Sequence, residues 1–256
     1  MPELPEVETI VRGLAPRLIG RRILAARILS KRVAPAPIPD LSGRAIRGLC
    51  RRGKFIVVEL DGGRLTIHLG MTGRLLLGAE PGPYTRAVFD LDCGRLLYDD
   101  IRMFGRIEWG AARVDRIGPE PLELGVDQFV RRLRERKGSI KPLLLNQAFL
   151  GGLGNIYTDE ALFRARIHPL TPAARLGRSR AARLHAAIVE VLTLGIRHRG
   201  SSVSDYVDSE GRRGEFQRLH QVYQREGEPC PRCGSAIRRI VVAQRGTHYC
   251  PRCQKK

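Results

Sequence analysis

The first twenty residues carry a hydrophobic pattern with the period of an α-helix. Five apolar side chains recur every three or four positions, which places them on one face of a helix. Pro5 lies near the start of this stretch and Gly20 follows its end, as is typical of helix boundaries. The pattern predicts a helix that buries one face, formed by Val7, Ile10, Val11, Leu14 and Leu18.

From residue 23 to residue 98 the pattern changes to short apolar runs of the β type. Turns rich in glycine and aspartate separate the runs, as in Asp61-Gly62-Gly63. Cys50 and Cys93 have strand-like neighbours here, so we expect both to be small buried hydrophobes. Short strands behind one helix predict a β-sandwich. The predicted strands are Ile23–Leu29, Phe55–Leu60, Leu65–Leu69, Arg74–Leu77, Ala87–Leu91 and Leu96–Tyr98.

The second half of the chain has a helical pattern. The change falls near Gly118-Pro119-Glu120-Pro121, which places a domain boundary around residues 112–122. Three parts are expected: a β-rich domain over residues 1–115, a helical domain over 122–218 and a small module over 220–254. Helices are predicted over Val126–Arg136, over Ile140–Leu145, from about Asn155, and over Ser179–His198.

The charge balance points to a polyanionic partner. The chain has 45 Lys and Arg against 26 Asp and Glu, which gives a formal net charge of +19. An excess of this size is typical of nucleic-acid-binding proteins. No apolar run approaches the roughly 18 residues of a membrane-spanning helix, and the first residues do not resemble a signal peptide. We therefore expect an intracellular protein that does not bind membranes.

Four cysteines near the C-terminus form two CxxC pairs with sixteen residues between them. Four thiolates at this spacing suit one tetrahedral zinc ion, which would stabilise a small β-hairpin that has little core of its own. A redox-active cysteine pair is the alternative, and two matching pairs in a basic segment make it the weaker one. The predicted zinc ligands are Cys230, Cys233, Cys250 and Cys253.

The beginning of the chain offers a candidate nucleophile. Pro2 is a small residue, so the initiator methionine should be removed and leave a secondary amine beside the carboxylate of Glu3. A chain-terminal amine has a pKa of about 7.7–8.0, far below that of lysine, so part of it is unprotonated near neutrality. Such an amine can form a Schiff base, with Glu3 moving protons. The alternative is that Pro2 and Pro5 serve only to start a helix.

Several motifs occur together in an order that resembles one protein family. The chain starts Pro2-Glu3-Leu4-Pro5-Glu6-Val7-Glu8-Thr9, continues with His68-Leu69-Gly70-Met71-Thr72-Gly73 and Gly152-Leu153-Gly154-Asn155-Ile156-Tyr157, and ends with Gln244-Arg245 between the two cysteine pairs. Over its whole length it resembles the bacterial formamidopyrimidine-DNA glycosylases. The resemblance implies an α+β fold: an N-terminal β-sandwich with flanking helices, a helical helix–two-turn–helix domain and a C-terminal β-hairpin zinc finger.

The resemblance also implies an activity and its catalytic residues. This family removes oxidised purines, chiefly formamidopyrimidines and 8-oxoguanine, from double-stranded DNA and then cleaves the abasic strand by β,δ-elimination. By this resemblance Pro2 is the nucleophile and Glu3 its acid/base partner. Lys54 would donate a proton during β-elimination, and Arg245 would grip phosphates and assist δ-elimination. From spacing alone, Lys54 is a charge at a strand edge and Arg245 a general phosphate contact.

The resemblance further implies DNA-binding residues. Met71 would enter the space left by the flipped base, Arg102 would hydrogen-bond the unpaired cytosine, and Phe104 would wedge beside it. For Met71 and Phe104, packing in the core is the alternative. The chain reads Arg102-Met103-Phe104-Gly105 where the family usually has a second arginine. The other expected contacts are Tyr84, Lys137, Lys141 and Asn155, and the segment over residues 200–216 matches the region of the lesion-recognition loop.

Two other functions fit part of the pattern. One is the sister branch that resembles endonuclease VIII and prefers oxidised pyrimidines. The other is a non-catalytic zinc-ribbon protein that only binds DNA, for which the charge and the cysteines are equally suitable. The start of the chain favours the purine-specific glycosylase over both. We expect this enzyme to be a monomer in the bacterial cytoplasm, bound to the nucleoid.

Overall fold

The computed structural model describes residues 1–255. By compactness the chain forms two units. The first comprises residues 1–116 and 195–217, and the second comprises the remaining described residues, 117–194 and 218–255. The three ranges predicted from the sequence, 1–115, 122–218 and 220–254, stay a prediction.

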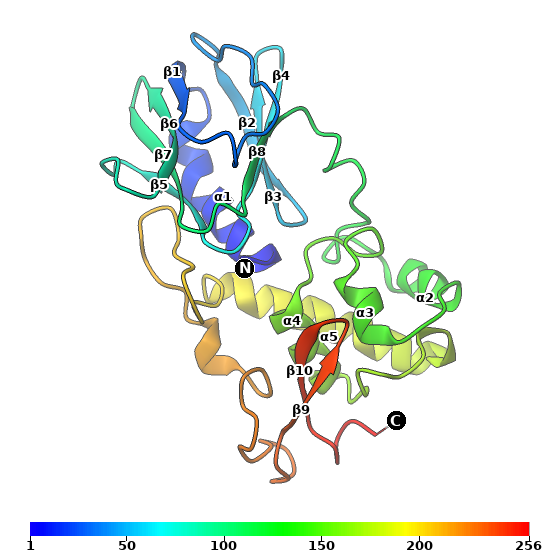
Figure 1. Cartoon of the computed structure of the whole chain (residues 1–256). Coiled ribbons are helices and arrows are strands. Elements are labelled where there is room, and N and C mark those ends of the chain that lie inside the picture. The colour runs from blue at the N-terminus through cyan, green and yellow to red at the C-terminus, as the bar shows by residue number, and fades with distance from the viewer. Residues whose placement is uncertain (256) are drawn as a thin grey trace. The chain divides into compact units, whose positions relative to one another are not determined.

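The first unit contains two four-stranded antiparallel sheets (Figure 1). One sheet has the order β1-β6-β7-β5 and the other the order β2-β3-β4-β8. The helix α1 (Leu4–Leu18) packs against β2 and β3 of the second sheet. The strands are β1 (Ile23–Ile28), β2 (Ile46–Arg52), β3 (Phe55–Leu60), β4 (Gly63–His68), β5 (Gly73–Leu77), β6 (Thr85–Leu91), β7 (Gly94–Asp100) and β8 (Arg106–Trp109).

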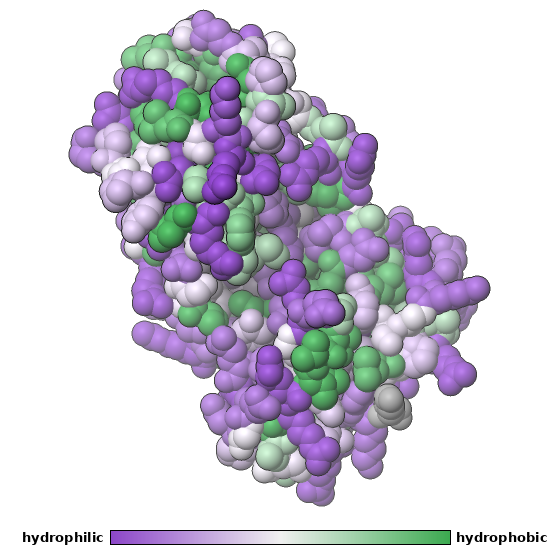
Figure 2. Space-filling view, in the orientation of Figure 1, coloured by the Kyte–Doolittle hydropathy of each residue, from purple (hydrophilic) through white to green (hydrophobic). Residues whose placement is uncertain are grey.

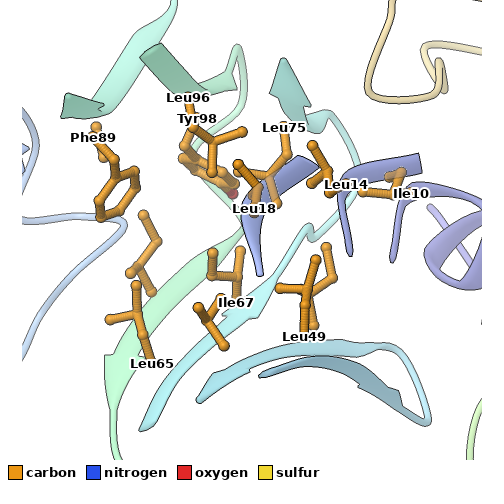
Figure 3. Close-up of a cluster of buried hydrophobic side chains, with 14 of the residues drawn as sticks. Ile10, Leu14, Leu18, Leu49, Leu65, Ile67, Leu75, Phe89, Leu96 and Tyr98 are labelled. Atoms are coloured by element: carbon orange, nitrogen blue, oxygen red, sulfur yellow. The ribbon is translucent and has the colours of Figure 1, made fainter. Parts of the chain in front are cut away.

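The core of this unit lies between the two sheets and α1. Figure 3 shows Leu14 and Leu18 of α1 facing side chains from both sheets, among them Ile67 and Leu75. These side chains are at most 1% exposed. Removing apolar surface from water on this scale is the main contribution to the stability of such a unit. The five residues of the predicted helical face are all buried, which confirms that prediction.

Two strands were not predicted, and two cysteines were predicted wrongly. The strand β8 alternates apolar with charged residues, and basic residues and Gly48 interrupt the apolar positions of β2, so neither has a continuous apolar run. Cys50 on β2 and Cys93 at the β6–β7 turn are both exposed, not buried. Alternation explains Cys50, since its neighbour Leu49 is the residue that points into the core.

The second unit is helical and ends in the predicted β-hairpin. Its helices begin or end within two residues of the predicted bounds. They are α2 (Val126–Arg134), α3 (Ile140–Leu145), α4 (Asn155–Arg164) and α5 (Arg178–Arg197), whose last three residues belong to the first unit. The remaining elements are the 3-10 turns η1 (Ala173–Arg175) and η2 (Phe216–Leu219), and the hairpin strands β9 (Arg238–Val242) and β10 (Arg245–Tyr249).

A buried glutamate attaches the segment before the hairpin to the helices. Glu160 on α4 is fully buried, and its carboxylate accepts hydrogen bonds from the backbone N–H groups of Gln221, Val222 and Tyr223 at 2.9–3.0 Å. Burial raises the pKa of Glu160 more than these hydrogen bonds lower it. The cysteine-rich module is therefore fixed to α4 through its own backbone.

Candidate active site

The start of α1 holds Pro2 and Glu3 in a fixed geometry. Glu3 is the N-cap residue, and its side chain accepts a hydrogen bond from the backbone N–H of Glu6. In return, the Glu3 backbone N–H donates to Glu6 Oε2 at 2.8 Å, which completes a capping box. Pro2 and Glu3 are buried, whereas Met1 is exposed. The nitrogen of Pro2 thus lies just outside the N-terminal end of α1.

The same glutamate anchors the segment that matches the lesion-recognition loop. Glu6 Oε1 accepts a hydrogen bond of 2.7 Å from the backbone N–H of Ser201. The Tyr206 hydroxyl donates to the Glu6 carbonyl oxygen at 3.3 Å. Between residues 201 and 215 the segment has no helix or strand. The carboxylate of Glu6 therefore connects the proposed nucleophile to the start of this irregular segment.

Lys54 lies at the tight turn between β2 and β3 and is 5% exposed. An ion pair connects this turn to α1, because Arg51 Nε lies 2.8 Å from Glu8 Oε2. Arg51 also donates to the Gly53 carbonyl oxygen at 3.4 Å. Partial burial raises the pKa of Glu8, but hydrogen bonds from Arg12 and Arg51 outweigh it, so this pKa lies below its usual value. The predicted proton donor thus sits on a turn that α1 holds in place.

His68 also lies close to Lys54, although no role of its own follows from the sequence. Its ring packs on Phe55 with 4.8 Å between ring centroids, and its Nδ1 accepts the backbone N–H of Gly70 at 3.1 Å. Burial and the positive charges of Lys54, Arg113 and Arg106 lower the pKa of His68 to about 4. A neutral imidazole therefore stands near Lys54 at physiological pH. Its position in the His68-Leu69-Gly70 motif was the only signal.

Two buried histidines make the stability of the protein depend on pH. The pKa of His68 and that of His220 are both lowered from 6.5 to about 4, chiefly by burial. As the pH falls below 6.5, the unfolded chain binds protons that the folded chain does not. We expect the free energy of unfolding to be constant with respect to these groups above pH 6.5. Between pH 6.5 and 4 it should fall by up to about 1.4 kcal/mol per pH unit for each histidine.

Urea unfolding at several pH values checks this expectation. Replacing either histidine with glutamine should make the decrease shallower, because glutamine does not titrate. A decrease of unchanged slope in both His68→Gln and His220→Gln would contradict it.

The predicted void-filling residues are exposed on two loops of the first unit. Met71, in the β4–β5 loop, is 38% exposed, and Phe104, in the β7–β8 loop, is 52% exposed. The alternative that these two pack in the core is therefore wrong. The Arg102 guanidinium lies 4.6 Å from the centre of the Phe104 ring. Met103, which replaces the usual arginine, has a φ of 53° and packs against the core. Tyr84, in the β5–β6 loop, is 48% exposed.

In the second unit, two helices contact the hairpin through polar side chains. Asn155 is the first residue of α4, and its side-chain amide donates to the Gly246 carbonyl oxygen at 2.8 Å. Lys141 on α3 is fully buried, and its ammonium lies 2.6 Å from Asp159 Oδ1 and 3.4 Å from the same Gly246 oxygen. Asp159 Oδ2 also accepts the backbone N–H of His248 at 2.9 Å.

These contacts correct one predicted site residue. Lys141 was expected to contact DNA, but a side chain with no exposed surface cannot reach a phosphate in this structure. It neutralises Asp159 and holds the hairpin instead. Lys137, by contrast, is exposed in the turn after α2. Arg245 is exposed too and directly follows the two-residue turn of the hairpin, as predicted.

The four cysteines fit one zinc ion. All four Sγ atoms lie within 4.8 Å of one another, with 3.4 Å between those of Cys233 and Cys250 and 3.9 Å between those of Cys230 and Cys253. A tetrahedral ion with Zn–S bonds of about 2.3 Å holds its sulfurs roughly 3.8 Å apart. The backbone N–H groups of Arg232 and Cys253 donate to two of these sulfurs, which stabilises thiolates. The residues thus match a structural zinc site of four thiolates.

Comparisons with known proteins match the chain from end to end. Residues 1–107 match the formamidopyrimidine-DNA glycosylase N-terminal domain, residues 117–207 match the H2TH domain of the same enzyme, and residues 227–256 match a zinc finger found in FPG and IleRS. The chain belongs to the formamidopyrimidine-DNA glycosylase family. The formamidopyrimidine-DNA glycosylase of Solibacter usitatus is 54% identical to this chain, and that of Chloroflexus aurantiacus is 47% identical. Each alignment covers at least 98% of both chains.

Solved structures of formamidopyrimidine-DNA glycosylases agree over the whole chain. MutM (Fpg) from Thermus thermophilus has a TM-score of 0.92 at 43% identity, with 100% of this chain and 99% of that chain covered. The Lactococcus lactis enzyme in complex with N7-benzyl-Fapy-dG-containing DNA has a TM-score of 0.91 at 38% identity, with both chains fully covered. The predicted family, fold class and zinc finger are thereby confirmed.

The family match settles the main functional alternatives. This glycosylase removes oxidised purines in base excision repair and is bifunctional, with an additional lyase activity at abasic sites. It has one structural zinc ion, held by the four cysteines. The endonuclease VIII-like and non-catalytic alternatives are set aside. Among residues 1–255, no helix combines the length and apolar character that crossing a membrane requires.

Proposed function

We propose that Pro2 is the nucleophile for both reactions of this glycosylase. After Met1 is removed, the Pro2 nitrogen bonds to the sugar C1′ as the bond from C1′ to the damaged base breaks. The C1′–O4′ bond then breaks as Glu3 delivers a proton to O4′, which leaves a Schiff base between Pro2 and C1′. This Schiff base acidifies the C2′ proton, and loss of that proton expels the 3′ phosphate. The buried Pro2-Glu3 pair at the capped end of α1 is the observation that carries this proposal.

Three other residues share the chemistry in this proposal. Glu3 moves protons at the sugar, and its backbone is already fixed by Glu6. Lys54 donates a proton during β-elimination, from a turn that the Arg51–Glu8 ion pair connects to the helix of Pro2. Arg245 grips the phosphates and assists δ-elimination, and its exposure at the hairpin tip leaves it accessible to DNA.

The DNA contacts follow from exposure and charge. Met71 and Phe104 fill the space left by the flipped nucleotide, as exposed apolar side chains do in other DNA-kinking proteins. Arg102 offers hydrogen bonds to the acceptors of the unpaired cytosine. Tyr84, Lys137 and Asn155 contact the backbone. Asn155 suits this task because it is the first residue of α4, and the N-terminal end of a helix favours an anion.

The partner in this proposal is double-stranded DNA with an oxidised purine or an abasic site. The Lactococcus lactis relative has been solved with DNA that contains N7-benzyl-Fapy-dG and with DNA that contains an abasic site. The net charge of +19 supports binding to a polyanion. Hydrophilic side chains cover most of the face that Figure 2 shows. We further propose a monomer in the bacterial cytoplasm, since one chain supplies every proposed group and the substrate is the chromosome.

Excision assays on matched duplexes test the proposed specificity. We expect faster release of 8-oxoguanine opposite cytosine than of thymine glycol opposite adenine, with the sequence of the duplex otherwise identical. Strand cleavage should leave phosphates on both sides of the gap, as β,δ-elimination requires. Faster release of thymine glycol would overturn the proposed preference for purines.

A further inference from the structure

Two loops of the first unit carry the two proposed void-filling residues and the arginine proposed to bind the unpaired cytosine. The β4–β5 loop, residues 69–72, carries Met71, and the β7–β8 loop, residues 101–105, carries Arg102 and Phe104. The loops are about thirty residues apart in the chain, and their exposed side chains add nothing to the core. Contacts other than core packing must therefore fix the position of one loop relative to the other.

The backbones of the two loops are in direct contact at Gly70, and Gly105 packs tightly against Tyr98 of β7. A Cβ added to Gly70 would lie 2.5 Å from the backbone of both Phe104 and Gly105. A Cβ added to Gly105 would lie 1.6 Å from the Tyr98 hydroxyl oxygen. No real side chain tolerates such distances, so the loops approach each other as closely as two backbones can.

A buried carboxylate lies where the loops meet. Asp100, the last residue of β7, is fully buried. Its Oδ1 accepts the Thr72 hydroxyl at 2.5 Å, and its Oδ2 accepts the Gly105 backbone N–H at 2.8 Å and the Tyr98 hydroxyl at 3.2 Å. One side chain therefore bonds to both loops at once.

Thr72 completes a hydrogen-bonded chain between the loops. Its hydroxyl donates to Asp100 and accepts the backbone N–H of Arg102 at 3.0 Å. Thr72 is itself 5% exposed, so water does not compete for these bonds. In a buried chain of this kind each bond polarises the next, and the loss of one group leaves others without partners. The backbone next to Met71 and that of Arg102 are thus joined through a single hydroxyl.

We propose that Asp100 and Thr72 are positioning residues that hold Met71, Arg102 and Phe104 as one rigid wedge and thereby set the selectivity for the opposite base. This inference rests on the proposed roles of those three side chains. Arg102 distinguishes cytosine from adenine only if its backbone is fixed while Met71 occupies the stack. The Asp100–Thr72 pair supplies that constraint, without touching DNA itself.

The test compares excision of 8-oxoguanine opposite cytosine and opposite adenine. Thr72→Val keeps the shape of the side chain but removes both hydrogen bonds of the hydroxyl. We expect the cytosine-to-adenine ratio of excision rates to fall at least about tenfold, because the Asp100 carboxylate and the Arg102 N–H both lose a buried hydrogen-bond partner. Thr72→Ser keeps the hydroxyl and should restore the ratio. Thr66→Val is the matched control, because Thr66 is equally buried and its hydroxyl bonds only to the Glu108 carbonyl oxygen.

The outcomes separate this inference from the proposed function. Arg102→Ala should lose the selectivity, and in the Arg102→Ala background Thr72→Val should have no further effect. Suppose that Arg102→Ala abolishes the cytosine-to-adenine selectivity but Thr72→Val leaves it unchanged. The positioning role is then wrong, and the proposed role of Arg102 stands. If Arg102→Ala keeps the ratio, the proposed role of Arg102 fails, and this inference with it. If Thr72→Val does not fold, Asp100→Asn serves instead, since the amide keeps only one acceptor oxygen and so cannot accept from both the Thr72 hydroxyl and the Gly105 N–H.

Discussion

Protein in which the Pro2 nitrogen is blocked will form no covalent adduct with abasic DNA under borohydride. An N-terminal extension makes this nitrogen an amide, whose electron pair is delocalised into the carbonyl and cannot attack C1′. Cleavage of the extension at Pro2 should restore the adduct in the same preparation. The measurement is the yield of trapped protein–DNA complex before and after cleavage, together with the mass of the chain.

This comparison excludes loss of folding as the cause, because the two forms differ only in the extension and share every residue from Pro2 onward. Thermal unfolding of both forms supplies the control. An adduct of full yield with the extension intact would move the nucleophile to another amine, and Lys54 would be the first to examine. Trapping by Lys54→Met would then distinguish the two.

The second large effect should come from the buried ion pair of the second unit. Asp159→Asn leaves the Lys141 ammonium buried without its counter-charge, and loss of one partner of a fully buried pair costs about 3–5 kcal/mol. Urea unfolding measures this loss. DNA binding should weaken as well, because Asp159 and Lys141 hold His248 and Gly246 of the hairpin that carries Arg245.

Two further variants show whether the charge itself is responsible. Lys141→Met combined with Asp159→Asn removes both charges and keeps an oxygen for the His248 N–H, so most of the stability should return. Asp127→Asn breaks the exposed pair with Arg178 and should cost less than about 1 kcal/mol. Equal losses in Asp127→Asn and Asp159→Asn would contradict the explanation.

Most of the fold could be predicted because local patterns encode it. The apolar stripe of α1, the continuous run of β3 and the spacing of the four cysteines are all readable within a short window of sequence. The strand β2 escaped prediction because basic residues and Gly48 interrupt its apolar positions. Cys50 was misjudged because it is exposed, whereas its neighbour Leu49 is the residue that is buried.

The candidate site was less predictable, because it depends on contacts between distant parts of the chain. Lys141 lies in a basic stretch that suggests an exposed face, and only the position of Asp159 on the neighbouring helix explains its burial. The role of Asp100 depends on Thr72, twenty-eight residues away. His68 was part of a recognised motif, but the burial that chiefly keeps it neutral, and the charges of Lys54, Arg113 and Arg106 that add to it, come from other parts of the chain. A pattern within a short window of sequence does not indicate contacts between residues that are far apart in the chain.

The turn of the hairpin has a further consequence for the zinc ion. Ala243 and Gln244 both adopt left-handed backbone angles, with φ of 49° and 58°, which glycine or asparagine adopts at a lower cost in free energy. Each such residue costs on the order of 1 kcal/mol. A strained apex persists only if its two strands are tied together below it, which the cysteine pairs do. The affinity for zinc and the conformation of the tip that presents Arg245 are therefore thermodynamically linked. A turn whose residues suit the left-handed angles would raise the affinity for zinc.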